Sequence, residues 1–265
     1  MADSVFLSAG HGGNDPGAVG YGLKEKDINL QTLLGCKAEL ERHNVKVFSS
    51  RTTDENDGVY EEVREAIASG VDLAISFHTN AGGGNGFEAY CNTANPDGVR
   101  LSKLAEKYIK ALGQNSRGVK DGTHLYFIRE TPMTAVLLEC FFIDNAADKN
   151  IGDTRAEQRA LGVAYAKAIL EYMGIAHKGN TPAKPAPLKP SKKLYRVQAG
   201  AYAKKAGAEK QVKALKDAGL DGAITYSAKD KLYRVQAGAY TVYANAEKMR
   251  DKVIAAGFAA FISEE

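Results

Sequence analysis

A proline-rich segment near residue 185 interrupts this chain and separates two regions of different character. Residues 179–190 carry four of the seven prolines. Such a segment lacks the backbone N–H groups that helices and sheets need, and it behaves as an extended spacer. We therefore expect an N-terminal domain at residues 1–177, a linker at 178–191 and a C-terminal domain at 192–265.

The regions on either side of this segment also differ in charge. Residues 178–265 hold 17 Lys and Arg against 8 Asp and Glu, a net charge of +9, whereas the first 177 residues have a net charge of −6. A basic tail suggests a polyanionic partner. The three cysteines form no Cys-x-x-Cys pair, which favours reduced thiols over a disulfide framework.

Apolar runs of strand length alternate with helical patterns before the proline-rich segment. Strands are expected at 5–8, 45–49, 73–78, 86–91, 123–127 and 134–139, and helices at 26–42, 60–69, 98–113 and 154–173. The alternation predicts an α/β domain with a central, mostly parallel, twisted sheet flanked by helices.

The tail contains an internal repeat. Residues 194–202 return unchanged at 232–240, and each copy is followed by a helical pattern and a second apolar run. Neither half can bury a sheet face and a helix alone, so the two halves should share one sheet. The sequence predicts a small α+β, ferredoxin-like βαββαβ domain.

Two histidines and a glutamate are the candidate metal ligands. His11 follows an apolar run in a glycine-rich turn, His78 closes another such run, and Glu25 opens a predicted helix. Each has an ordinary structural explanation when taken alone, such as a hydrogen-bonded histidine or a carboxylate at a helix N-terminus. Together, at strand ends of an α/β sheet, they match the ligand set of a hydrolytic zinc site.

Glu139 lies inside an apolar run, where an unpaired carboxylate is costly. It is either a buried ion-pair partner or a proton-transfer group whose pKa is raised by burial. Cys140 offers a rival thiol nucleophile, but adjacent strand residues point to opposite faces, so we assign Glu139 to the site and Cys140 to packing. Arg51 and Asn80 follow predicted strands and are candidates to line the cleft, although Arg51 can equally hold a loop through an ion pair. His124 is a further candidate for the rim.

Five ordered motifs make the front of the chain resemble the zinc-dependent N-acetylmuramoyl-L-alanine amidases of the amidase-3 type. The motifs are residues 8–18, 23–30, 50–52, 76–80 and 138–140, and the resemblance covers about residues 3–173. It implies that His11, Glu25 and His78 bind one zinc ion and that Glu139 is the catalytic acid/base. The implied reaction is hydrolysis of the amide between the muramic acid lactyl group and L-alanine of the peptidoglycan stem.

The tail, from residue 192 to 265, resembles a SPOR domain, whose repeats carry a motif like Tyr-Arg-Val-Gln-Ala-Gly-Ala-Tyr. The resemblance implies binding to peptidoglycan glycan strands. Gln198 and Gln236 can hydrogen-bond to sugars. Four tyrosines of the repeats can stack on sugar faces, unless the alternation of each strand turns them toward the helices. These are Tyr195, Tyr202, Tyr233 and Tyr240.

The sequence thus predicts a peptidoglycan hydrolase, either a phage endolysin or a bacterial autolysin, with glycan strands and stem peptides as its partners. The alternatives are a peptidoglycan metallopeptidase and a non-catalytic wall- or nucleic-acid-binding protein. The aromatic RNP1 pattern is absent, which argues against RNA. No apolar run of 18 residues and no signal-peptide pattern is present. We expect no membrane insertion, synthesis in the cytoplasm, and action on the wall after holin-type release or mother-cell lysis.

Overall fold

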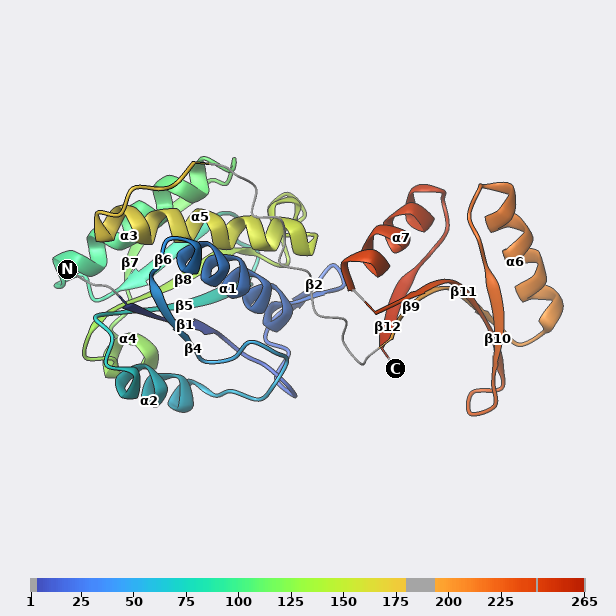
Figure 1. Cartoon of the computed structure of the whole chain (residues 1–265), viewed down its shortest axis with the longest axis horizontal. Helices are drawn as coiled ribbons and strands as arrows, with labels where there is room; N and C mark the ends of the chain where they lie inside the picture. The colour runs from blue at the N-terminus through green and yellow to red at the C-terminus, as the bar shows by residue number, and fades with distance from the viewer. Residues whose placement is uncertain (1–3, 180–193, 242, 265) are drawn as a thin grey trace. The chain divides into compact units, whose positions relative to one another are not determined.

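The chain folds into two compact units, Met1–Thr181 and Pro182–Glu265, each with its own hydrophobic core (Figure 1). The computed structural model describes residues 4–179, 194–241 and 243–264. The linker expected at 178–191 therefore lies outside the described residues, apart from its first two. In the described part of the chain, no helix has the length and apolar character needed to cross a bilayer.

The N-terminal unit is built on a six-stranded sheet of order β4-β1-β5-β8-β6-β7. Its strands are β1 (Ser4–Ala9), β4 (Lys46–Ser49), β5 (Leu73–Asn80), β6 (Phe87–Cys91), β7 (Ser116–Asp121) and β8 (Thr134–Phe142). The strands β4, β1, β5 and β8 pair in parallel, β6 runs antiparallel to β8, and β7 is parallel to β6. The predicted central, mostly parallel sheet is confirmed.

Helices cover both faces of this sheet (Figure 1). Helices α1 (Glu25–Arg42), α3 (Pro96–Lys110) and α5 (Arg155–Met173) pack on one face, and α2 (Val59–Ser69) and α4 (Tyr126–Glu130) on the other. Strand β1 shows why both faces are apolar: Val5 and Leu7 enter the larger core cluster and Phe6 enters the smaller one. Smaller elements are β2 (Val19–Gly20), β3 (Leu23–Lys24) and the 3₁₀ turn Asp148–Ile151.

One predicted element of this unit is wrong. Residues 123–127 form a turn and the start of α4 rather than a strand. The remaining strand of the six-stranded sheet is β7, which was not predicted. Strand β7 has the sequence Ser-Arg-Gly-Val-Lys-Asp and lies at the sheet edge, where one side needs no apolar neighbours, so its hydrophobic pattern is weak. Phe127 and Ile128 instead reach the smaller core cluster from α4.

The C-terminal unit has the expected βαββαβ order. Its elements are β9 (Tyr195–Tyr202), α6 (Lys205–Asp217), β10 (Ala223–Ser227), β11 (Leu232–Tyr240), α7 (Tyr243–Ala255) and β12 (Phe261–Glu264). All pairings in the sheet β10-β11-β9-β12 are antiparallel, and the two repeat strands, β9 and β11, lie side by side at its centre. Val197 and Val235, at equivalent places in the repeats, are fully buried beneath the helices.

Candidate metal centre

His11 lies in the loop that follows β1. Its backbone φ is +65°, a left-handed conformation that is uncommon for a residue with a side chain. The ring Nδ1 contacts Asp15 Oδ2 at 2.8 Å, and Nε2 lies 3.3 Å from Glu25 Oε2. Strained backbone of this kind is often found where a side chain must be aimed at a functional site.

Glu25 is the first residue of α1 and is buried between the two histidines. Its Oε1 accepts a hydrogen bond from Thr79 N at 3.0 Å and lies 3.1 Å from His78 Nδ1, while Oε2 accepts from Ala18 N at 2.9 Å. These backbone donors fix the carboxylate, so the position of Glu25 does not depend on the histidines alone.

His78, on β5, packs directly against the backbone of Gly10. A methyl group at Gly10 would lie 2.1 Å from Cε1 of His78, so only glycine leaves room for the imidazole. Gly17 has a φ of +63°, and a methyl group there would lie 2.7 Å from Glu25 Oε2 and from His11 Cδ2. The glycines of the first motif therefore make space for the three candidate ligands.

The loop that carries His11 is held by side chains from elsewhere in the fold. Arg51, only 2% exposed, donates to the carbonyl oxygens of Ala9 and Lys26 at 2.9 and 2.8 Å. Asn29, one turn after Glu25 on α1, donates to Gly10 O at 3.0 Å. Arg51 thus supports a loop through backbone carbonyls. Asn29 was not singled out from the sequence, where its signal is a polar residue on the inward face of a helix.

The carboxylate and the two histidines shift one another's pKa values. The hydrogen bond to Glu25 raises the pKa of His11 to about 9. Burial acts to raise the pKa of Glu25, but the hydrogen bonds from both histidines outweigh it and hold that pKa well below its usual range. One nitrogen or oxygen from each of the three side chains lies within 4.8 Å of the others. This arrangement suits a bound cation.

Glu139 lies opposite His78 in the parallel pairing of β5 and β8. Its Oε2 is buried and has no hydrogen-bond partner among the described residues. Burial raises the pKa of Glu139 to about 7, so the group can gain or lose a proton near neutrality. Cys140 points into the core on the opposite face, where burial raises its pKa to about 12, and it is not positioned to act as a nucleophile at this centre.

A cavity of about 320 Å³ opens beside the two histidines on the side of α2 and α4. Carboxylates of Asp57 and Glu62 line it together with apolar groups, among them Val59 and Phe127. Glu62 is only 2% exposed, and burial raises its pKa. This side of the centre is therefore acidic and apolar.

A different cluster lies on the other side of Glu139. Glu88 of β6 is paired with Glu139 in the antiparallel register, and its carboxylate contacts Asn80 Nδ2 at 3.1 Å and Tyr90 OH at 2.8 Å. Asn80 therefore binds Glu88 and not the three candidate ligands. His124 is exposed, and its ring meets the Tyr90 ring edge-on at 6.1 Å between centroids.

A second group of two histidines and one glutamate lies at the end of α1. Glu39 Oε1 is 2.8 Å from His177 Nε2 and 2.5 Å from Arg42. His43 donates from Nδ1 to the Glu39 carbonyl at 2.8 Å and accepts at Nε2 from Lys178 N at 2.9 Å. Both ring nitrogens of His43 are already used, so this group is a hydrogen-bonded clasp on residues 177–178.

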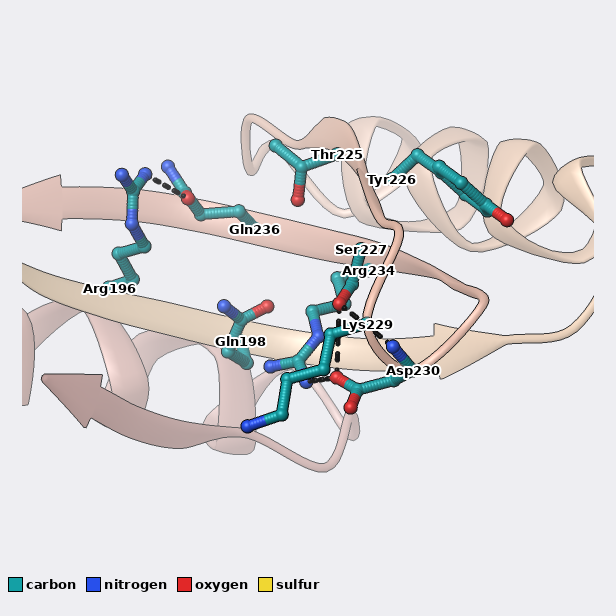
Figure 2. Close-up of a pocket in the computed structure, with 9 residues that line it drawn as sticks. All are labelled: Arg196, Gln198, Thr225, Tyr226, Ser227, Lys229, Asp230, Arg234 and Gln236. Atoms are coloured by element: carbon teal, nitrogen blue, oxygen red, sulfur yellow. Dashed lines mark hydrogen bonds and ion pairs between the residues drawn. The ribbon is translucent and has the colours of Figure 1, made fainter. Parts of the chain in front are cut away.

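The open face of the tail sheet carries a polar hollow of about 460 Å³ (Figure 2). It is lined by Arg196, Gln198, Arg234 and Gln236, together with residues 225–227, Lys229 and Asp230. Arg196 donates to Gln236 Oε1 at 2.8 Å, and Gln198 Oε1 is buried without a partner among the described residues. The four repeat tyrosines pack against the core instead, and Tyr226 points away from this group, so aromatic stacking does not form the face.

Comparison with known proteins agrees with both units. Residues 5–171 match the family model described as N-acetylmuramoyl-L-alanine amidase, and residues 182–264 match the SPOR domain model. The amidase CwlM of Bacillus licheniformis is 32% identical over 226 residues, which cover 84% of this chain and 84% of that protein. The endolysin of Bacillus phage SPP1 is 35% identical over 69% of this chain and 72% of its own length.

Solved structures are similar to the N-terminal unit. The catalytic domain of CwlV, an N-acetylmuramoyl-L-alanine amidase from Bacillus (Paenibacillus) polymyxa, superposes with a TM-score of 0.61 at 29% identity. The match covers 66% of this chain and 99% of that one. The fold, the ordered motifs and the relatives therefore indicate the same protein family.

Proposed function

The chain belongs to the N-acetylmuramoyl-L-alanine amidase family, and we propose that it hydrolyses the amide between the muramic acid lactyl group and L-alanine in peptidoglycan. The observation that carries the proposal is the meeting of His11, Glu25 and His78 next to Glu139, whose Oε2 is buried. Two imidazoles and one carboxylate, with room for substrate, match the ligand set of hydrolytic zinc sites.

The donor atoms suit a zinc ion. At metal–ligand distances of about 2.0–2.2 Å, tetrahedral ligand atoms are separated by about 3.3–3.6 Å. His11 Nε2 lies 3.3 Å from Glu25 Oε2 and His78 Nδ1 lies 3.1 Å from Glu25 Oε1, so each histidine approaches a different oxygen of the carboxylate, and one donor atom from each of the three residues lies within 4.8 Å of the others. Asp15 holds the other nitrogen of His11, an arrangement common behind zinc-bound histidines. Zinc held there supplies a Lewis acid for the amide carbonyl and an acidified water.

Glu139 is the proposed acid/base. Its unpartnered Oε2 can accept a proton from the attacking water and then give it to the nitrogen of L-alanine as the amide breaks. Its burial keeps it able to hold a proton near neutral pH. The protein chain adds position: Arg51 and Asn29 fix the loop, and the β5–β8 pairing fixes Glu139 beside His78.

The tail is proposed to hold glycan strands on its open face. Arginine and glutamine side chains there can hydrogen-bond to sugar hydroxyl and acetamido groups, and Gln198 Oε1 offers an acceptor with no protein partner among the described residues. This sheet face lacks the stacked aromatic pairs typical of RNA-recognition sheets in its described part. Attachment to the wall raises the local concentration of scissile amides at the catalytic unit.

The site of action is the cell wall. A phage lysin released through a membrane pore and a bacterial autolysin acting at mother-cell lysis both fit this activity. The proposed domain division, catalytic residues 1–177 and wall-binding residues 192–265, allows either setting, since each unit has its own core.

Digestion of purified peptidoglycan, followed by mass analysis of the new ends, tests the reaction. We expect free L-alanine amino termini and intact glycan, with activity lost on chelation and restored by zinc. New amino groups within the stem peptide would instead identify a peptidase. Wall binding without new ends in the zinc-loaded protein would identify a non-catalytic binding protein.

A further inference from the structure

The surfaces on the two sides of His78 and Glu139 differ in charge. Toward α2 and α4, the cavity beside His78 is lined by the carboxylates of Asp57 and Glu62 and by apolar walls. Beyond Glu139 in the other direction, strand β7 presents Arg117 and Lys120. An anionic part of a substrate is repelled from the first side and attracted to the second.

Glu88 holds these two cations in place. Its Oε1 accepts from Arg117 Nε and Lys120 Nζ, each at 2.5 Å, while Oε2 accepts from Asn80 and Tyr90. Glu88 is 2% exposed, so its position is fixed by the sheet. Two cations share one carboxylate, which leaves the cluster with a surplus of one positive charge.

Both cations remain accessible. The side chains of Arg117 and Lys120 are 45% and 36% exposed, in contrast to the buried Glu88 between them. Arg117 uses Nε for Glu88, and in the described part of the chain its two terminal nitrogens make no hydrogen bond. Those nitrogens form the planar edge that binds a carboxylate in two parallel hydrogen bonds.

The strand order places this cluster at a defined distance from the chemistry. Strands β5, β8, β6 and β7 are consecutive neighbours and carry, in order, His78, Glu139, Glu88 and the cation pair. With neighbouring strands about 4.8 Å apart, β7 lies about 10 Å from β8. About three extended residues span that distance. A group on the second or third residue after the scissile amide can therefore reach the cations.

We propose that Arg117 and Lys120 form a subsite for a carboxylate of the stem peptide. The peptide then extends over β6 and β7, and the uncharged sugar lies on the side of α2 and α4. There Tyr126, which lines the cavity, meets the exposed Tyr60 edge-on at 4.6 Å and offers an aromatic surface for a sugar. This inference rests on the proposed function, because it assumes cleavage of the sugar–peptide amide.

The test compares one substrate in two charge states. An N-acetylmuramoyl tripeptide, L-alanyl-γ-D-glutamyl-L-lysine in its peptide part, is prepared with free carboxylates and with both carboxylates converted to carboxamides. We expect the zinc-loaded full-length protein to favour the acid by roughly three- to tenfold in kcat/KM, the range for charge-assisted hydrogen bonds at a half-exposed site. The double variant Arg117→Gln, Lys120→Gln should bring this ratio to about one.

The ratio is insensitive to the folded fraction, because both substrates meet the same preparation. Glutamine at both positions also leaves amide donors for Glu88. The matched control is Lys107→Gln, an exposed lysine of α3 paired with Glu171 of α5, which should keep the wild-type ratio. An unchanged ratio in the double variant, or no acid preference in the wild type, overturns the subsite.

A binding measurement separates this inference from the proposed function. Calorimetric titration of the zinc-loaded protein with the free tripeptide, as acid and as amide, requires no turnover. If neither muramoyl substrate is cut at the lactyl amide, the proposed function fails. In that case, tighter binding of the acid than of the amide by the wild type, and equal binding of the two by the double variant, supports the subsite. Equal binding of acid and amide by the wild type, or an unchanged preference in the double variant, overturns it.

Discussion

Two clusters with the same composition, two histidines and one glutamate, lie in the N-terminal unit and are surrounded differently. In the first, His11, Glu25 and His78 come from a loop, a helix start and a strand, and backbone N–H groups hold the carboxylate. In the second, Glu39 and His43 belong to the last turn of α1 and its cap, and His177 joins them from the end of the unit.

The difference lies in which donor atoms are still available. Both ring nitrogens of His43 form hydrogen bonds with backbone groups, and the Glu39 carboxylate is shared by Arg42 and His177. At the first cluster, His11 Nε2 and His78 Nδ1 both contact the carboxylate of Glu25. A metal can replace those hydrogen bonds without leaving a backbone group unpaired. Composition and proximity are therefore insufficient to identify a metal site.

The largest expected effect comes from removing a proposed ligand of the first cluster. His78→Ala should lose zinc and reduce wall hydrolysis by at least about 10³-fold, since both polarisation of the amide and acidified water depend on the metal. Zinc per chain by atomic absorption and release of L-alanine amino termini measure this. His43→Ala is the matched control and should keep one zinc per chain. Loss of zinc from the control would reverse the comparison.

Glu139→Gln should separate metal binding from proton transfer. The amide cannot accept a proton, so kcat should fall by about 10²- to 10⁴-fold while zinc stays bound. Zinc content and kcat are measured on the same preparation. If zinc is lost together with activity, Glu139 belongs to the ligand shell and the assignment of three protein ligands is wrong.

Asp15→Asn should weaken the first cluster by a smaller amount. Asp15 fixes the Nδ1 side of His11, and partners of this kind typically contribute 10- to 100-fold to metal affinity. Competition with a chromogenic chelator measures the zinc Kd. Asp121→Asn, an exposed carboxylate that caps the turn after β7, serves as the control and should leave the Kd unchanged. Equal affinities of wild type and Asp15→Asn would contradict the role given to Asp15.

The smallest effect is expected at the second cluster. His177→Ala removes one hydrogen bond from Glu39, which Arg42 still holds, so unfolding in urea should show a loss of about 1 kcal/mol. Zinc content and kcat should match those of the wild type. A fall in zinc content from two ions to one would show that the clasp binds metal in solution.

Much of the fold follows from local patterns. The apolar runs that became β1, β5 and β8 are continuous because parallel central strands are buried on both faces, and such runs stand out in the sequence. The order of strands and helices in the C-terminal unit could be predicted because the same pattern occurs twice in the repeat. Strand β7 was missed because an edge strand of polar residues has no such run.

Local sequence patterns were enough to predict the candidate donor residues, their places at strand and helix ends, and the two-part organisation of the chain. The contacts between distant polar groups are seen only in the folded chain: Arg51 on the His11 loop, Glu88 beside Glu139, and His177 on Glu39. The physical reason is that a hydrogen bond acts only over about 3 Å. Strand order and loop closure set such distances between residues far apart in the chain, and no local pattern records them.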